Sequence, residues 1–376
     1  MAAFKDELGA SAVDELGAAF ARADDGFPVA DFRRLALDGI EELELKARVM
    51  HIIAALREVL PADYPDALPK LVDALAHGTT EAKVSGSPDF LSTPAGLRGF
   101  AAWPVIDFVG EYGLEEPELS LRALPEMTSY FSAEFAVRPF LIHHEKLALR
   151  HMKKWASHKN EHVRRLASEG SRPILPWGIR LPSLLAEPEK VLPILKQLPN
   201  DPSNYVRRSV ANHMNDISKN HPQWMIAQLK KWGGTKLPWI RHGLRTLVKN
   251  SHPEVWPLLG YDPYLKVKVV RFEVEPKRIR IGEEVTLTAE FELQQSIEAP
   301  VVVDYGLHLV RANGSRSLKV FKWKNTTLSP KTSTSFKKRH SFKPVTTRKY
   351  YSGTHQLDVQ LNGRVLASVE FELEKD

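Results

Sequence analysis

Apolar residues recur every three or four positions through the first two thirds of the chain, and roughly every second position through the last third. The first spacing predicts amphipathic helices and the second predicts half-buried strands. Segments 31–60 and 66–78 have the helical period, and prolines divide the segments around them. The period changes at 259–265, "LGYDPYL", where we expect a hinge.

A related helical segment occurs three times in the middle of the chain. "VRRLASEGSRP" begins at Val163, "VRRSVANHMND" at Val206 and "IRHGLRTLVKN" at Ile240, offsets of 43 and 34 residues. Each follows another helical stretch and a polar turn. Helix pairs repeated at this interval bury their apolar faces by stacking on one another. We therefore expect an α-solenoid of HEAT-like repeats over residues 1–262.

Residues 265–376 contain seven short alternating segments separated by turn signals such as Asn313-Gly314 and Asn362-Gly363. That number of strands in about 110 residues is typical of an immunoglobulin-like β-sandwich. The predicted fold class is therefore multidomain α + β, with the helical repeats first and the sandwich second.

Charge is distributed unevenly along the chain. Residues 1–130 hold 11 Lys/Arg against 23 Asp/Glu, residues 131–264 hold 21 against 10, and residues 265–376 hold 20 against 13. A basic excess in two successive segments indicates a polyanionic partner for the C-terminal two thirds. The alternative is that the charges are only spread unevenly.

Absent sequence features exclude several classes of protein. The chain has no cysteine, which rules out disulfides and thiolate metal sites. No apolar run approaches the roughly 20 residues of a membrane span, and the N-terminus is acidic where a signal peptide needs a basic flank. Phosphate-binding glycine loops, HExxH and GxSxG are missing. We expect a cytoplasmic protein without membrane contact, metal or cofactor.

The repeat helices combine an apolar side with a polar face. Val163, Leu166, Ala167 and Gly170 form the apolar side of the first, and Arg165 and Glu169 share another face because they are four residues apart. The equivalent polar face is Arg208, Asn212 and Asp216 in the second repeat and His242, Thr246 and Lys249 in the third. Stacking places these faces side by side.

Acidic residues on such a basic face have two readings. Glu169 can simply pair with Arg165 on a solvated surface. Alternatively, since each acid opposes phosphate binding, Glu169 and Asp216 can serve to face a cation that is bound or that develops during a reaction. Trp177 follows the helix, in a loop that Pro173, Pro176 and Gly178 restrict. It can stack on a base or sugar or attract a cation, or it can pack between repeats.

Three runs carry a family resemblance: "SAEFAVRPFL" (132–141), "NEHVRRLASEGSRPILPW" (160–177) and "YVRRSVANHMNDISKNHP" (205–222). They resemble the AlkC branch of the HEAT-repeat DNA alkylation repair glycosylases, some of which carry an immunoglobulin-like domain. The resemblance implies excision of cationic alkylated bases, chiefly 3-methyladenine and also 3-methylcytosine, from duplex DNA. It also implies a bent duplex, a lesion that is not drawn into a deep pocket, and no cofactor.

The resemblance also implies site residues. Glu134, Glu169 and Asp216 match the family's catalytic acids, and Trp177 matches its aromatic position near the lesion. The repeat positions suggest phosphate contacts from Arg164, Arg165, Arg207, Arg208, Arg241 and Lys249. Some of these six can instead pair with acids between repeats.

Two readings of the function remain. In the first, the protein is a monomeric DNA glycosylase whose carboxylates stabilise an oxocarbenium-like sugar while water attacks, with duplex DNA that contains alkylated bases as its partner. In the second, the repeats are a non-catalytic scaffold that binds DNA or protein.

Overall fold

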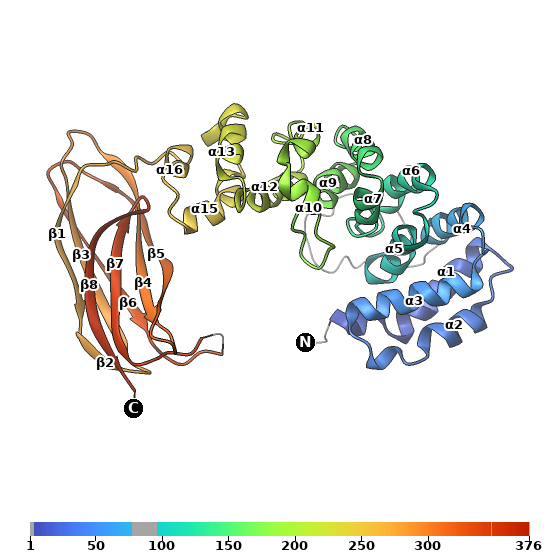
Figure 1. Ribbon diagram of the computed structural model, residues 1–376, viewed down its shortest axis with the longest axis horizontal. Coiled ribbons are helices and arrows are strands. Elements are labelled where there is room, and N and C mark those ends of the chain that lie inside the picture. The colour runs from blue at the N-terminus through green and yellow to red at the C-terminus, as the bar shows by residue number, and fades with distance from the viewer. Residues whose placement is uncertain (1–3, 77–95, 347, 376) are drawn as a thin grey trace. The chain divides into compact units, whose positions relative to one another are not determined.

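The computed structural model describes residues 4–76, 96–346 and 348–375, which form two compact units, Met1–His221 and Pro222–Asp376 (Figure 1). The first unit is helical, and the second combines short helices with strands. The predicted fold class is confirmed. No helix in the described ranges is both long enough and apolar enough to span a bilayer.

Helices of the first unit stack in successive pairs, with α8 on α9 and α9 on α12. Short 3-10 turns, η1 to η4, join some of them. The helices are α1 (Ala10–Ala23), α2 (Val29–Leu37), α3 (Leu45–Val59), α4 (Tyr64–Ala76), α5 (Ala102–Tyr112), α6 (Pro117–Met127), α7 (Arg138–His143), α8 (Glu145–Trp155), α9 (Glu161–Gly170), α10 (Pro182–Ala186), α11 (Leu192–Leu195) and α12 (Asn204–Ser218).

The sequence of α9 defines both ends of that helix. Asn160 caps its N-terminus, because the side-chain oxygen accepts a hydrogen bond from the backbone N–H of His162 at 2.9 Å. Val163 and Leu166 are fully buried on the predicted apolar side, which stabilises the fold by roughly 1.5–3 kcal/mol for each side chain. Ser171 Oγ donates to the carbonyl of Ala167 at 2.7 Å, and Pro173 prevents continuation.

The second unit begins with short helices: α13 (Pro222–Lys231), α14 (Ile240–Gly243), α15 (Arg245–Lys249) and α16 (Val255–Leu258). The expected single helix from Ile240 is divided after Gly243, a residue type with low helix propensity. The last helix ends at Leu258 and the first strand begins at Val267, whereas the compact units divide after His221. The domain bounds 1–262 and 265–376 stay a prediction.

Two sheets form the sandwich, whose strands are drawn in orange to red in Figure 1. One has the order β1-β3-β6 and the other β2-β8-β7-β4-β5, with antiparallel pairing except between β2 and β8. The strands are β1 (Val267–Glu275), β2 (Arg278–Arg280), β3 (Glu284–Leu293), β4 (Ala299–Val310), β5 (Arg316–Leu328), β6 (Ser333–Ser341), β7 (Gly353–Leu361) and β8 (Arg364–Glu374). The seven expected segments match all of these except β2, which is too short to show a period.

The tight turn between β7 and β8 is where the sandwich meets helix α16. Asn362 and Gly363 have φ of 48° and 75°, as the predicted Asn-Gly turn requires. Asn362 also donates to the carbonyl of Asp262 at 2.8 Å. Gly363 lies directly against the buried Trp256, whose ring atoms would be 2.3 Å from an added Cβ. This turn therefore needs glycine for its φ and for the space beside Trp256.

We expect Gly363→Ala to lower the free energy of unfolding of the second unit by about 2–4 kcal/mol, since left-handed strain and overpacking act together. Gly314→Ala is the matched control, because Gly314 has φ of 76° and nothing within 4 Å of an added Cβ. Thermal unfolding of both variants measures the difference. Equal destabilisation by the two substitutions would contradict a packing role for Gly363.

Candidate active site

The three predicted acids lie close together in the first unit. Glu134 follows α6 in the turn that leads into α7, Glu169 is in the last turn of α9, and Asp216 is in the last turn of α12. Stacking of α9 on α12 brings the last two together, as the repeat alignment predicted. Glu134 joins them through a contact with Arg165 of α9.

Two arginines connect the acids into one chain of ion pairs. Arg165 pairs with Glu134 through one terminal nitrogen and with Glu169 Oε1 at 3.5 Å through the other. Arg172 pairs with Glu169 Oε1 at 2.6 Å and with Asp216 Oδ2 at 2.8 Å. Since each guanidinium bridges two carboxylates, the arginines fix the spacing of all three acids.

This chain of ion pairs is largely buried. The side chains of Glu134, Glu169 and Asp216 are 14%, 6% and 2% exposed. Burial opposes ionisation of Glu169, but the charges of Arg165 and Arg172 hold its pKa below the ordinary value. Glu169 is therefore a carboxylate at neutral pH in spite of its burial.

The charges of the cluster do not fully cancel. Three carboxylates and two guanidinium groups leave one negative charge. Lys219, 40% exposed at the edge, donates to Asp216 Oδ1 at 3.1 Å and offsets it from the solvent side. Arg165 also lies over the ring of Tyr205, 5.0 Å from its centroid. With Lys219 included, the paired groups sum to zero, and the guanidinium of the neighbouring Arg138 also interacts with Glu134, Glu169 and Asp216.

Arg138 binds the backbone next to the cluster, and it was not among the site residues that the sequence predicted. It is fully buried, and burial lowers the pKa of its guanidinium to about 10. Its Nη1 donates to the carbonyls of Gly170 and Arg172, each at 2.9 Å, and its Nε donates to the carbonyl of Ile179 at 2.6 Å. Arg138 thus holds both ends of the loop that follows α9. Its position in the "EFAVRPF" run was the only available signal.

Arg172 was also missed, although it stands three residues after Glu169, a spacing that brings helical side chains together. Trp177 lies in the loop that Arg138 holds. Its side chain is 61% exposed and its φ is 62°, a left-handed conformation that costs a bulky residue about 1–2 kcal/mol. The predicted exposed loop position is therefore present in the structure.

A layer of hydrogen bonds joins α9 to α12 beside the acids. Ser209 Oγ donates to Ser168 Oγ at 2.9 Å, and His213 Nδ1 lies 2.9 Å from the carbonyl of Ser168. His213 is fully buried, and burial together with the charge of Arg172 lowers its pKa to about 3. A neutral imidazole that donates from Nδ1 satisfies this geometry. These contacts set the register of the two helices that carry Glu169 and Asp216.

The six cations expected to contact phosphates have different surroundings. Arg165 belongs to the ion-pair chain. Arg164 and Arg207 each donate to the carbonyls five and six residues earlier, and Arg164 also makes a two-pronged pair with Asp201. Arg241 donates to the hydroxyl of Tyr261 at 2.7 Å. Arg208 and Lys249 are exposed. Contact of these residues with DNA stays a prediction.

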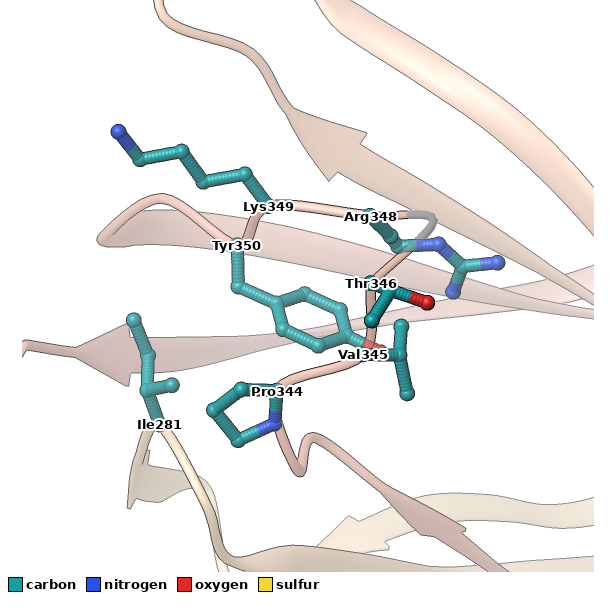
Figure 2. A pocket seen from close by; sticks show the side chains of 7 residues that line it. All are labelled: Ile281, Pro344, Val345, Thr346, Arg348, Lys349 and Tyr350. Carbon is teal, nitrogen blue, oxygen red and sulfur yellow. The ribbon is translucent and has the colours of Figure 1, made fainter.

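A hollow of about 510 Å³ lies in the sandwich and not at the acids. Figure 2 shows the ring of Tyr350 above Pro344 and Ile281, while Arg348 and Lys349 extend away from it in different directions. Arg348 and Lys349 are its charged lining residues, and its lining includes no carboxylate and no histidine. Within the described ranges, no group of three or more His, Asp or Glu is arranged to hold a metal ion.

Two family models match the chain, one for "DNA alkylation repair enzyme" over residues 127–246 and one for "Uncharacterised protein YhaZ, C-terminal Ig-like domain" over 268–375. A curated relative, the uncharacterized protein YhaZ of Bacillus subtilis, is 39% identical over 342 residues, which is 90% of each chain. A solved structure, the Pseudomonas fluorescens alkylpurine DNA glycosylase AlkC bound to DNA containing an abasic site analog, is 34% identical. It covers 99% of this chain and 100% of its own, with a TM-score of 0.84.

The chain belongs to the AlkC-type DNA alkylation repair family. It has the form of the family that carries a C-terminal immunoglobulin-like domain, so the predicted sandwich type is confirmed. The DNA alkylation repair model spans Glu134, Glu169, Trp177 and Asp216, together with both bridging arginines. The helices before residue 127 lie outside that model, although the AlkC structure matches them as well.

We expect His213 to make the stability of the first unit depend on pH. Its folded pKa lies below the unfolded value of 6.5, so the unfolded chain binds one more proton between about pH 3 and 6.5. Stability therefore falls as the pH falls through this window, by about 1.4 kcal/mol per pH unit for this group. His213→Asn keeps a donor near the Ser168 carbonyl but does not titrate.

Urea unfolding of wild type and His213→Asn between about pH 5 and 6.5 measures the difference, in a range above the titration of ordinary carboxyl groups. The variant should have the shallower pH dependence. Parallel curves would show that His213 keeps an ordinary pKa in the folded protein.

Proposed function

We propose that this protein is a DNA glycosylase that excises cationic alkylated bases, 3-methyladenine and 3-methylcytosine, from duplex DNA. The observation that carries the proposal is the buried chain Glu134–Arg165–Glu169–Arg172–Asp216, which keeps Glu169 ionised. The loop that follows Arg172 carries the exposed Trp177. Membership of the AlkC-type family and the likeness to an alkylpurine DNA glycosylase over the whole chain support it.

The protonation state of the acids suits this reaction. An N3-methylated base carries a positive charge, so its bond to deoxyribose is weakened before the enzyme acts. Cleavage moves positive charge onto the sugar, which becomes oxocarbenium-like. A carboxylate near the anomeric carbon stabilises that charge, and a second one can orient the attacking water. No group has to protonate the leaving base, so Glu169, held ionised by Arg165 and Arg172, is in the required form.

Different acids suit different roles. Asp216 and Glu169 share Arg172 and lie at the same ends of neighbouring helices, so we assign them to the sugar and the water. Glu134 shares Arg165 with Glu169 and lies beside them. Arg172 binds one oxygen of Glu169 and one oxygen of Asp216, and these two bonds fix the orientation of both carboxylates. The remaining lone pairs of the two acids are then available to the sugar and the water.

The surroundings of Trp177 suit a lesion that is not drawn into a deep pocket. A cavity of about 120 Å³ lies next to this loop, lined in part by Gly178 and Ile179. That volume is well below the roughly 300–1,000 Å³ of pockets that enclose a small ligand. An exposed indole can instead lie against a cationic base that remains near the duplex, where cation–π attraction favours the methylated form.

Phosphate binding is assigned to cations that face solvent. Arg208 and Lys249 are exposed. Three further residues remain candidates through the guanidinium N–H groups that their internal hydrogen bonds do not use: Arg164, Arg207 and Arg241. We propose that a monomer binds one duplex in this way. Binding should weaken steeply with added salt, because phosphate contacts release counterions.

Glu169→Gln and Asp216→Asn should each lower the single-turnover rate of 3-methyladenine release by roughly a hundredfold or more, because they remove a charge that stabilises the transition state. Amide replacements are preferred to alanine because alanine would remove one of the two partners of the buried Arg172, and breaking a buried ion pair costs about 3–5 kcal/mol. Affinity for DNA with an abasic site analogue should stay within a few-fold of wild type.

Glu126→Gln is the control for this experiment, since Glu126 is an exposed carboxylate on α6 outside the ion-pair chain. It should release the base at the wild-type rate. A wild-type protein that binds methylated duplex without releasing base would instead favour the scaffold reading, and one that does neither would exclude DNA as the substrate.

The sandwich offers a second surface for DNA. β5 carries the exposed Lys319, Lys322 and Lys324, and the ammonium of Lys324 lies over the ring of Phe336 on β6. Edge strands with several outward cations suit contact with phosphates rather than with bases. We propose that this edge helps to clasp the duplex.

The double variant Lys322→Glu, Lys324→Glu should weaken binding to methylated duplex and reduce the slope of log affinity against log salt by roughly one for each phosphate that is no longer bound. Lys268→Glu, on the exposed side of β1, is the matched control. Gel-shift or anisotropy titrations at several salt concentrations measure both. The same slope for all three proteins would assign DNA binding to the helical repeats alone.

A further inference from the structure

Helices outside the DNA alkylation repair model reach the loop that carries Trp177. The cavity of about 120 Å³ beside this loop is walled by α3, α5, the segment around Phe135 and the backbone of Gly178. Lys46 of α3 and Trp103 and Asp107 of α5 are among its lining residues. Glu134 and Trp177 are the chain neighbours of Phe135 and Gly178, so this cavity adjoins two of the proposed site residues.

Lys46 contacts the loop that carries Trp177 directly. Its ammonium donates to the backbone carbonyl of Trp177 at 2.7 Å, across 131 residues of sequence. The same ammonium lies 5.8 Å from the centroid of the Phe135 ring. A single side chain from the N-terminal helices therefore touches both the tryptophan loop and the residue after Glu134.

Trp103 and Asp107 of α5 line the same cavity as Lys46. Trp103 stacks on Phe135, with ring centroids 5.3 Å apart and an interplanar angle of 25°, and its Nε1 donates to Asp107 Oδ2 at 2.6 Å. Asp107 Oδ1 is buried without a hydrogen-bond partner among the described residues. Burial raises the pKa of the Asp107 carboxyl to about 7, against the influence of Trp103 and Lys46. Asp107 therefore does not fully neutralise Lys46 near neutral pH.

Trp177 needs external support for its backbone conformation. A bulky residue with φ of 62° persists only where neighbouring groups hold it. Arg138 holds the loop at Ile179, and Gly178 donates to the carbonyl of Leu175 at 3.1 Å. The carbonyl of Trp177 itself is held by Lys46.

We propose that Lys46 is a positioning residue for Trp177: it fixes the carbonyl of the strained residue so that the exposed indole is presented toward the lesion. This inference rests on the proposed function. It assigns to the acidic N-terminal helices a part in the reaction, which is to supply a cation that reaches the tryptophan loop from α3.

A double-mutant cycle tests it. Lys46→Met should slow single-turnover release of 3-methyladenine by between about three- and tenfold, the worth of one hydrogen bond. In a Trp177→Ala background the same substitution should have no further effect, since the group it positions is gone. Lys46→Arg, which can donate to the same carbonyl, should restore most of the rate.

Lys146→Met is the control, because it removes an exposed ammonium from α8. Any effect it has should be equal in both backgrounds. The proposal is overturned if Lys46→Met leaves the rate unchanged, or slows it by the same factor whether or not Trp177 is present. Equal melting temperatures for Lys46→Met and Lys46→Arg would exclude a difference in folding.

A second measurement needs no activity and so separates failure of this inference from failure of the proposed function. The chain has eight tryptophans, and in protein labelled with 5-fluorotryptophan the ¹⁹F resonance of Trp177 is identified by its disappearance in Trp177→Phe. Lys46→Met should shift or broaden that resonance in DNA-free protein, and Lys46→Arg should leave it near the wild-type position. An unchanged resonance in Lys46→Met overturns the proposal even if the wild-type enzyme is active.

Discussion

Two buried guanidinium groups determine the properties of the acidic cluster. Removing an ion from water costs several kcal/mol, and three carboxylates at close range also repel one another. Arg165 and Arg172 reverse both effects, because each lies between two acids. Without them the acids would take up protons or turn toward solvent. The presence of carboxylates at this buried position therefore depends on the two arginines. The bonds from Arg138 and His213 only hold the backbone to which the acids are attached.

The same two arginines also reduce the repulsion that the acids would exert on DNA phosphates in the proposed complex. In the proposed complex, three isolated carboxylates near phosphates would oppose association, since phosphate binding is dominated by charge. The two guanidinium groups in the chain of ion pairs instead cancel most of the acidic charge, and Lys219 adds a further positive charge at its edge. Repulsion is thereby reduced, while each carboxylate still keeps its own charge for a sugar cation at contact distance. Part of the basic excess of residues 131–264 is thus internal and does not measure the strength of DNA binding.

The helical repeat made Glu169 and Asp216 predictable. Their faces follow from the four-residue spacing within a helix, and stacking of equivalent helices places those faces together. Arg164 and Arg207 show the limit of that reasoning: they occupy equivalent positions and do make equivalent bonds, but to carbonyls of their own repeats. Periodicity identifies a shared surface, whereas it does not tell which cations on that surface are already bound.

The rest of the site depends on contacts between distant parts of the chain. Glu134 lies in a turn before a short helix, where no period applies, and only the family resemblance singled it out. Arg138 binds a carbonyl 41 residues away, and Lys46 binds one 131 residues away. Such contacts depend on how distant helices pack, so local sequence patterns do not reveal them. Both contacts hold the loop of the left-handed Trp177, so in the proposed role of Lys46 the orientation of this exposed residue depends on parts of the first unit that lie far apart in the sequence.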